Sequence, residues 1–181
     1  MGLDQYLEAR QYISKRDWTG TEPTDNADFT IVQPMTMPGV IDPNGFGGIT
    51  MEYNAAQWRK ANAIQRWMND ELAGGDMENC KSYPIDADKL DQLRQDCKAV
   101  LEVKRRSTFV AAGGRANTKM VEEVAEERGL YPMEGYFFGT YDFDEWYFRD
   151  LEYTVAVIER LDKAGALKPE SDVTFTYRAW W

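Results

Sequence analysis

Aromatic rings and carboxylates alternate most densely between Gly135 and Asp150, in a chain that contains no histidine. Aromatic faces bind planar or apolar groups, and carboxylates bind metal ions and other cations, so this run is the first candidate site. Its carboxylates belong to Asp142, Asp144, Glu145 and Asp150. They are candidate metal ligands without a recognised motif, because the glycine and the terminal ligand of a calcium loop are missing from their places.

The same run also has a purely structural interpretation. Asp142 and Glu145 stand in the relation of a helix N-cap and its third helical residue, so both could satisfy the free N–H groups of a helix that follows. Four aromatic side chains of the run are large enough to form the main core of a small domain instead, namely Phe137, Phe138, Trp146 and Tyr147. The sequence leaves the functional and the structural interpretation open.

A second candidate lies in the basic block Trp58-Arg59-Lys60, a local exception in an acidic chain. A helix through this block places Arg59, Asn62 and Arg66 at i, i+3 and i+7, near one side. Arginine offers bidentate donors, asparagine a two-way hydrogen bond and tryptophan a stacking surface, so the set suits a nucleotide-like ligand. The alternative is an amphipathic helix whose basic side pairs with the abundant acids.

If the two segments pack together, residues 135–139 bring their backbone close to a ligand held by the basic block, with Tyr136 or Phe138 as a stacking partner. We therefore expect a binding site formed by Trp58, Arg59, Lys60, Asn62, Arg66, Tyr136 and Phe138. The sequence predicts no catalytic residue and no cofactor, because it contains no phosphate-binding loop and no recognised context for a serine or cysteine nucleophile.

Size and composition limit the class of protein. The 181 residues (20.9 kDa) predict one domain, 1–181, and 43% hydrophobic residues with a mean hydropathy of −0.60 indicate a water-soluble globular protein. No apolar run approaches the ~20 residues that cross a bilayer. The first residues lack the features of a signal peptide, so we expect a cytoplasmic protein. Cys80 and Cys97 are then reduced thiols, with Cys97 on the apolar face of a helix.

The net charge of −10 and the pI of about 4.6 disfavour direct binding to nucleic acid or to an anionic membrane. The same acidity permits a different function, in which the surface imitates nucleic acid and inhibits a protein that normally binds it. That alternative predicts carboxylates spaced in a stripe along one face.

Hydrophobic periodicity predicts the elements that must position these residues. We expect a strand over 3–13, an irregular excursion over 14–48 with a short strand at 29–32, and a strand over 49–53. A helix then begins at an Asn54 N-cap and ends at Gly74. Further helices are expected from an Asp86 cap to about residue 101, over 118–128, and from Asp142 or Asp144 to just before Gly165.

The stretch 103–115 is expected to be a flexible connection, and residues 173–180 alternate as a final strand. Strands near both termini with helices between them predict an α+β fold, in which a small, mostly antiparallel sheet is packed by three to four helices. The last two residues, Trp180 and Trp181, either fold back on the core or are available to a second subunit in a homo-oligomer.

Several short motifs resemble a family of small bacteriophage and prophage proteins that has no settled activity. They are Met1-Gly2-Leu3-Asp4 with Tyr6-Leu7, the block 58–64 with Trp67, Asn79-Cys80, and Phe137-Phe138-Gly139 with Asp144-Glu145-Trp146-Tyr147. The chain departs from that resemblance at Gln5, where we associate the family with methionine, and at Gln65, where we associate it with histidine.

The resemblance implies a phage accessory protein, a class that often counteracts host defence by binding something. We therefore expect a non-enzymatic protein that sequesters a nucleotide-like signal or binds a host protein. The alternatives are a carboxylate-based, metal-dependent hydrolase and the acidic inhibitor that mimics nucleic acid. The hydrolase requires its carboxylates to converge on one point.

Overall fold

The structure is a computed structural model that describes residues 2–17, 20, 22, 24–29, 47–110, 118–135 and 138–181, without the side chains of 107–110 and 118. A four-stranded antiparallel sheet forms its centre, with the strand order β4-β1-β6-β5. The strands are β1 (Asp4–Ser14), β4 (Gly48–Arg59), β5 (Ser82–Ile85) and β6 (Val173–Trp180). The predicted α+β fold with strands near both termini is confirmed.

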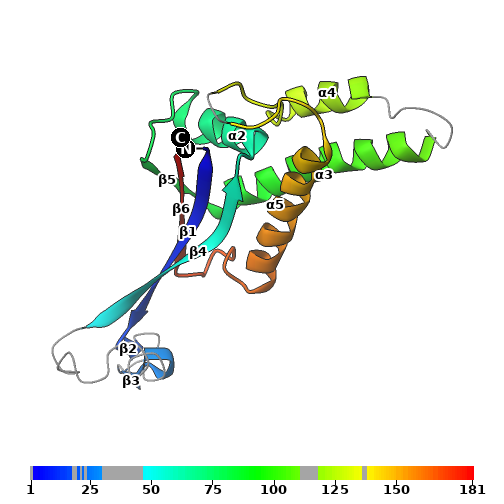
Figure 1. The fold of residues 1–181 in the computed structure, drawn as a ribbon. Helices are drawn as coiled ribbons and strands as arrows, with labels where there is room; N and C mark the ends of the chain where they lie inside the picture. Colours follow the sequence, from blue (N-terminus) through cyan, green and yellow to red (C-terminus); the bar gives the residue numbers. More distant parts are fainter. Residues whose placement is uncertain are drawn as a thin grey trace.

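Strand β1 is central because alternate residues are apolar and face the helices. Leu3, Leu7 and Ala9 are fully buried on that side. The pairing of Asp4 with Trp180 brings the two ends of the chain together (Figure 1). Beyond the last β6 pair, at Gln11, β1 and β4 continue as a two-stranded arm toward the small hairpin of β2 (Arg16–Asp17) and β3 (Thr24–Asp25).

The helices lie on one side of the sheet (Figure 1). They are α2 (Asn62–Ala73), α3 (Ala87–Val110), α4 (Thr118–Glu127) and α5 (Glu145–Lys163). One predicted stop and one predicted cap explain two of their bounds: Gly74 ends α2 in a left-handed conformation, and the Asp86 carboxylate, just before α3, accepts from the Lys89 amide at 2.8 Å. None of the helices within the described residues is long and apolar enough to cross a membrane.

The prediction of a helix capped by Asn54 is wrong. Strand β4 pairs with β1 all the way from Ser14–Gly48 to Asp4–Arg59, and α2 begins only at Asn62. Trp58 fitted a helical period in the sequence, but it belongs to a strand. Ala56 and Trp58 are both buried on the core side, as the alternation of a strand requires. Ladder hydrogen bonds along the whole of β1 therefore overrode the local helical pattern.

Two other predicted connections also differ. Helix α3 continues through Val110, so residues 103–110 are helical where a flexible connection was expected, and 111–117 lie outside the described residues. Of the short strand predicted at 29–32, Phe29 belongs to a helical turn and the rest lies outside the described residues. Cys97 is buried as expected, Cys80 is exposed, and both are free thiols.

A polar network crosses the core between β1, β6 and α2. Tyr177 donates its hydroxyl proton to the Gln65 side chain at 2.6 Å and accepts from Gln5 at 2.9 Å. Gln5 also exchanges two hydrogen bonds of 3.1 Å with the backbone of Ala61. Gln5 and Gln65 thus meet at one hydroxyl, and their amides fix the start of α2 on the sheet.

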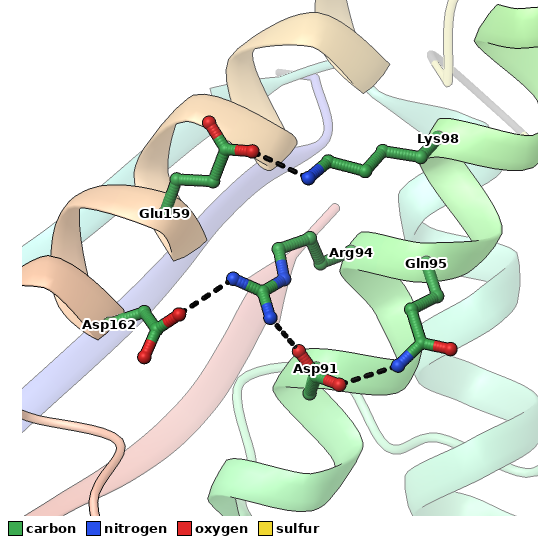
Figure 2. A network of polar contacts seen from close by, with 6 residues as sticks. All are labelled: Asp91, Arg94, Gln95, Lys98, Glu159 and Asp162. Carbon is green, nitrogen blue, oxygen red and sulfur yellow. Dashed lines mark hydrogen bonds and ion pairs between the residues drawn. The ribbon is translucent and has the colours of Figure 1, made fainter.

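Charged side chains join α3 to α5 at the outer surface. Arg94 contacts Asp91 on its own helix and donates to Asp162 of α5 at 2.8 Å, and Lys98 pairs with Glu159 at 2.6 Å (Figure 2). Gln95 donates to the other oxygen of Asp91. Every charged group drawn in Figure 2 therefore has an oppositely charged partner.

Candidate functional site

A pocket of about 490 Å³ opens where the end of β4 meets the segment that leads into α5. One wall comes from residues 59–63 and the other from residues 139–150. Its lining residues are Arg59, Lys60, Asn62, Ala63, Gly139, Thr140, Asp142, Asp144, Trp146, Tyr147 and Asp150. The two candidate segments of the sequence analysis therefore do pack together, and a cavity lies between them.

The junction between β4 and α2 forms the first wall. Asn62 is buried and donates from its side-chain amide to the Thr140 carbonyl at 2.8 Å, which ties the two walls together. Lys60 has a left-handed backbone with φ of 62°, which is rare for a residue with a side chain. Its ammonium group has no ion-pair partner among the described residues. The wall thus holds a cation that the fold itself does not neutralise.

Gly139 forms the closest approach between the walls. Its φ of 103° is rarely adopted by residues with a side chain, and a Cβ atom there would lie 3.3 Å from the Lys60 carbonyl oxygen and the Lys60 Cβ. A side chain would therefore be strained and would press on the Lys60 wall. This contact explains why a glycine stands at the pocket.

Helices α2 and α5 both begin at the pocket, and their N-termini are capped differently. Helix α5 has Asp144 as an N-cap, whose Oδ1 accepts from the Tyr147 amide at 2.9 Å, and Glu145 in its first turn. Helix α2 has no side-chain cap and no acid in its first turn. The Ala63 amide, in that first turn, has no acceptor among the described residues. The positive end of α2 is therefore left for an anion, beside Arg59 and Lys60.

Helix α5 is held against β4 by polar contacts on the far side of the pocket. The Trp58 indole donates to Thr154 at 2.9 Å, and Arg160 donates to the Ala55 carbonyl at 3.1 Å, at a bulge in β4. These contacts set the position of the α5 residues that line the pocket, which are Trp146, Tyr147 and Asp150.

Trp146 and Asp150 lie one helical turn apart on the same face of α5. The Trp146 side chain is 67% exposed, and the guanidinium of Arg149 lies 4.9 Å from its ring centroid. Burial, with a smaller contribution from the nearby Asp144 carboxylate, raises the pKa of Asp150 to about 7. The Asp150 carboxyl makes no hydrogen bond or ion pair with a described residue.

Three of the four proposed metal ligands, Asp142, Asp144 and Asp150, line the same pocket. Asp144 is occupied as the N-cap of α5 and by the Thr140 hydroxyl, which donates at 3.0 Å. The cap is thus Asp144, one of the two predicted starts of the helix, and the cap role that was considered for Asp142 is not observed. Asp142 and Asp150 line the pocket, and Glu145 is an exposed residue outside the lining. No group of three or more acidic or cysteine side chains among the described residues is arranged to hold a metal ion.

The structure separates the predicted ligand-binding residues into two groups. Arg59, Lys60 and Asn62 line the pocket. Arg66 is not in the lining and forms a bidentate ion pair with Glu126, with both hydrogen bonds at 3.0 Å. The helix face that was expected to unite Arg59 and Arg66 does not exist, because Arg59 belongs to strand β4.

Two of the predicted aromatic contacts belong to the core. Trp58 and Phe138 are buried, and Phe138 packs edge-on against Trp181 with 5.7 Å between ring centroids. The ring centroids of Trp180 and Tyr6 are 4.7 Å apart. Both terminal indoles, Trp180 and Trp181, therefore fold back on the molecule. Tyr136 lies outside the described residues.

Sequence reasoning assigned no binding role to Trp146 or Thr140 and considered Asp150 only as a metal ligand. The i, i+4 spacing of Trp146 and Asp150 was visible in the sequence and places them on one helix face. Thr140 gave no signal, because its contribution is a backbone carbonyl. No protein-family model, no curated protein and no solved structure matches this chain.

Proposed function

We propose that the protein is a non-catalytic binding protein that holds a small nucleotide-like ligand in this pocket. One observation carries the proposal: the uncapped start of α2, with Arg59 and Lys60, faces an exposed Trp146 across a cavity of about 490 Å³. A cavity of this size is in the range of small-molecule sites. The cationic wall suits a phosphate and the indole suits a stacked base.

The biological role that we infer is sequestration. The resemblance to phage accessory proteins favours a ligand that acts as a host signal, and removing a signal requires only tight binding. A host protein as the partner is the alternative within the same class.

The proposal is tested by calorimetric titration of the purified protein with AMP, GMP, UMP, ADP-ribose and cyclic di- and trinucleotides. We expect saturable binding of at least one of them with one site per chain. Inorganic phosphate and the matching nucleoside should each bind much more weakly, because each fills one half of the pocket. A flat response to the whole panel overturns the proposal.

Lys60→Gln and Lys98→Gln form a matched pair of variants for this titration. Both remove one exposed ammonium, but Lys98 is paired with Glu159 on the far α3–α5 surface. We expect Lys60→Gln alone to weaken binding, by about tenfold, as the loss of a charged hydrogen bond predicts. Equal effects of the two variants would show that general charge, and not the pocket, attracts the nucleotide.

A hydrolase is the second candidate, favoured by the raised pKa of Asp150 beside Asp144. A carboxyl that titrates near neutrality suits a general acid or base. Chromatography of each bound nucleotide after prolonged incubation separates the two functions. We expect unchanged nucleotide, and a product whose formation stops in Asp150→Asn would favour the enzyme.

A further inference from the structure

The pocket has two chemically different ends. Arg59, Lys60 and the start of α2 form the cationic end, and Trp146 with Asp150 forms an end that combines an aromatic face with a carboxyl. The Asp150 carboxyl is half-buried and without a hydrogen bond to a described residue. The Asp150 oxygens are still accessible to solvent, so a ligand in the pocket can supply the hydrogen-bond donors that the described residues do not.

The position of Asp150 relative to Trp146 limits what those donors can be. The two residues are one turn apart on one helix face and line the same pocket, so a planar ring that stacks on the indole can turn its edge toward the carboxyl. A carboxylate accepts two parallel hydrogen bonds from two adjacent N–H groups. The ligand edge is therefore expected to carry paired donors.

Among the common bases only guanine meets this condition, with N1–H and the 2-amino group side by side. Adenine and cytosine present a donor next to an acceptor lone pair, which a carboxylate repels. Uracil presents one N–H between two carbonyls. A site built for hydrogen-bonding donors rejects analogues that lack them, because its own buried group is then left unpaired.

We propose that the ligand is a guanine nucleotide, with its base stacked on Trp146, its N1–H and 2-amino groups donating to the Asp150 carboxylate, and its phosphate at Arg59, Lys60 and the α2 N-terminus. This inference rests on the proposed function, and it adds a specificity-determining residue, Asp150, that reads the base.

The first experiment compares GMP, IMP and AMP by calorimetry at pH 7. IMP differs from GMP only in lacking the 2-amino group. We expect GMP to bind at least about tenfold more tightly than IMP, and AMP to bind more weakly than GMP. Binding of all three with equal affinity overturns the guanine assignment but leaves the proposed function intact. Binding of none of them, nor of any nucleotide in the wider panel, overturns both.

Asp150→Asn and Asp162→Asn form the second experiment, because both changes keep the side-chain volume and Asp162 lies on the α3–α5 surface, outside the pocket lining. Xanthine carries a carbonyl acceptor where guanine has its 2-amino donor, and the asparagine amide can donate to it. We expect Asp150→Asn to lose at least about tenfold in GMP affinity and to gain affinity for XMP. Asp162→Asn should keep the preference for GMP. Unchanged GMP affinity in Asp150→Asn contradicts the assignment.

The pH dependence gives an independent measurement on the unmodified protein. The charged groups around Asp150 are Asp144 and Arg149 on its own segment, Asp142 on the preceding turn, and Arg59 and Lys60 on the opposite wall. Paired donors bind only the ionised carboxyl, whereas AMP shares the phosphate titration of GMP. The ratio of GMP to AMP affinity should therefore rise about tenfold from pH 6 to pH 8, as a pKa near 7 predicts. A constant ratio contradicts the role of Asp150.

Discussion

The pocket and the α3–α5 surface contain similar charged groups in opposite situations. On the α3–α5 surface Arg94 lies between two aspartates and Lys98 pairs with Glu159 (Figure 2). In the pocket the charged groups of Lys60 and Asp150 have no ion-pair partner among the described residues. Charges that serve folding are matched within the chain, and charges left unmatched in a cavity are available to a ligand.

The pocket and the α3–α5 surface also differ in backbone conformation. The α3–α5 pairs project from regular helices, whereas the pocket is built from Lys60 and Gly139, both with positive φ. Strained backbone is retained where the surrounding contacts over-determine it, and such positions concentrate at functional sites. The strained conformation of Lys60 and its unmatched charge therefore support the same conclusion about the pocket.

Reversing the cationic wall gives the largest expected effect. The double change Arg59→Glu with Lys60→Glu replaces both cations and should lower GMP affinity by about 100-fold or more, since each charged contact contributes roughly tenfold. The free energy of unfolding should fall by less than about 1 kcal/mol, because both side chains are exposed and only the 3.9 Å ion pair between Arg59 and Asp4 is lost. Calorimetry and urea denaturation measure the two quantities.

The matched control is Lys98→Glu on the α3–α5 surface. It places a carboxylate opposite Glu159 and should leave GMP affinity unchanged. If this distant reversal weakened GMP binding as much as the pocket reversal, the distinction between the two regions would fail.

The pH dependence of stability gives the next effect. The pKa of Asp150 is about 7 in the folded protein and about 3.9 when unfolded, so the folded state binds the extra proton between these values. Stability therefore falls as pH rises from about 4 to 8. Asp150→Asn should remove this loss and stabilise the protein by roughly 1–2 kcal/mol at pH 8, after a discount for partial solvent exposure, with no gain near pH 4.

Urea denaturation of both proteins at the two pH values measures this difference. Glu159→Gln is the comparison on the α3–α5 surface, because the hydrogen bond from Lys98 lowers the pKa of Glu159 instead of raising it. A gain at pH 8 in both variants would mean that lower net charge, and not the pocket environment, produces it.

Gly139→Ala tests the backbone at the closest approach of the pocket walls. The added methyl group requires a strained φ and lies 3.3 Å from Lys60, so we expect a loss of about 1 kcal/mol in the free energy of unfolding and weaker GMP binding. Gly165→Ala is a matched control with φ of 80° far from the pocket, after the end of α5. It should lose stability without a change in GMP affinity.

The sequence predicted the fold well where one local signal dominated. Alternation defined β1 and β6, and Asp86, Gly74 and Gly165 marked helix ends. It failed at residues 54–59, where the decisive interaction was pairing with β1, more than forty residues away in the chain. Asn54 is a good cap by type, but strand pairing determined its conformation.

The candidate site was partly predictable for the same reason. Arg59, Lys60 and Asn62 stood out by residue type, although the helix face that was expected to unite them does not exist. Arg66 and Phe138 were assigned to the wrong surroundings, because their partners Glu126 and Trp181 are distant in sequence. The charges that define the site are those without an ion-pair partner among the described residues. The sequence alone does not show which charged side chains lie close enough to pair, because this depends on the folded structure.

The smallest expected effect is on the α3–α5 surface itself. Arg94→Gln removes both ion pairs of that half-buried guanidinium, but its two aspartate partners are accessible to solvent and such pairs contribute little, so we expect a loss of about 0.5 kcal/mol that shrinks further in 1 M NaCl. Urea denaturation at low and high salt measures it, with GMP affinity unchanged throughout. A loss of several kcal/mol that salt did not reduce would mean that this network holds α3 and α5 together. The paired charges on this surface would then stabilise the fold, and would not merely neutralise neighbouring acids.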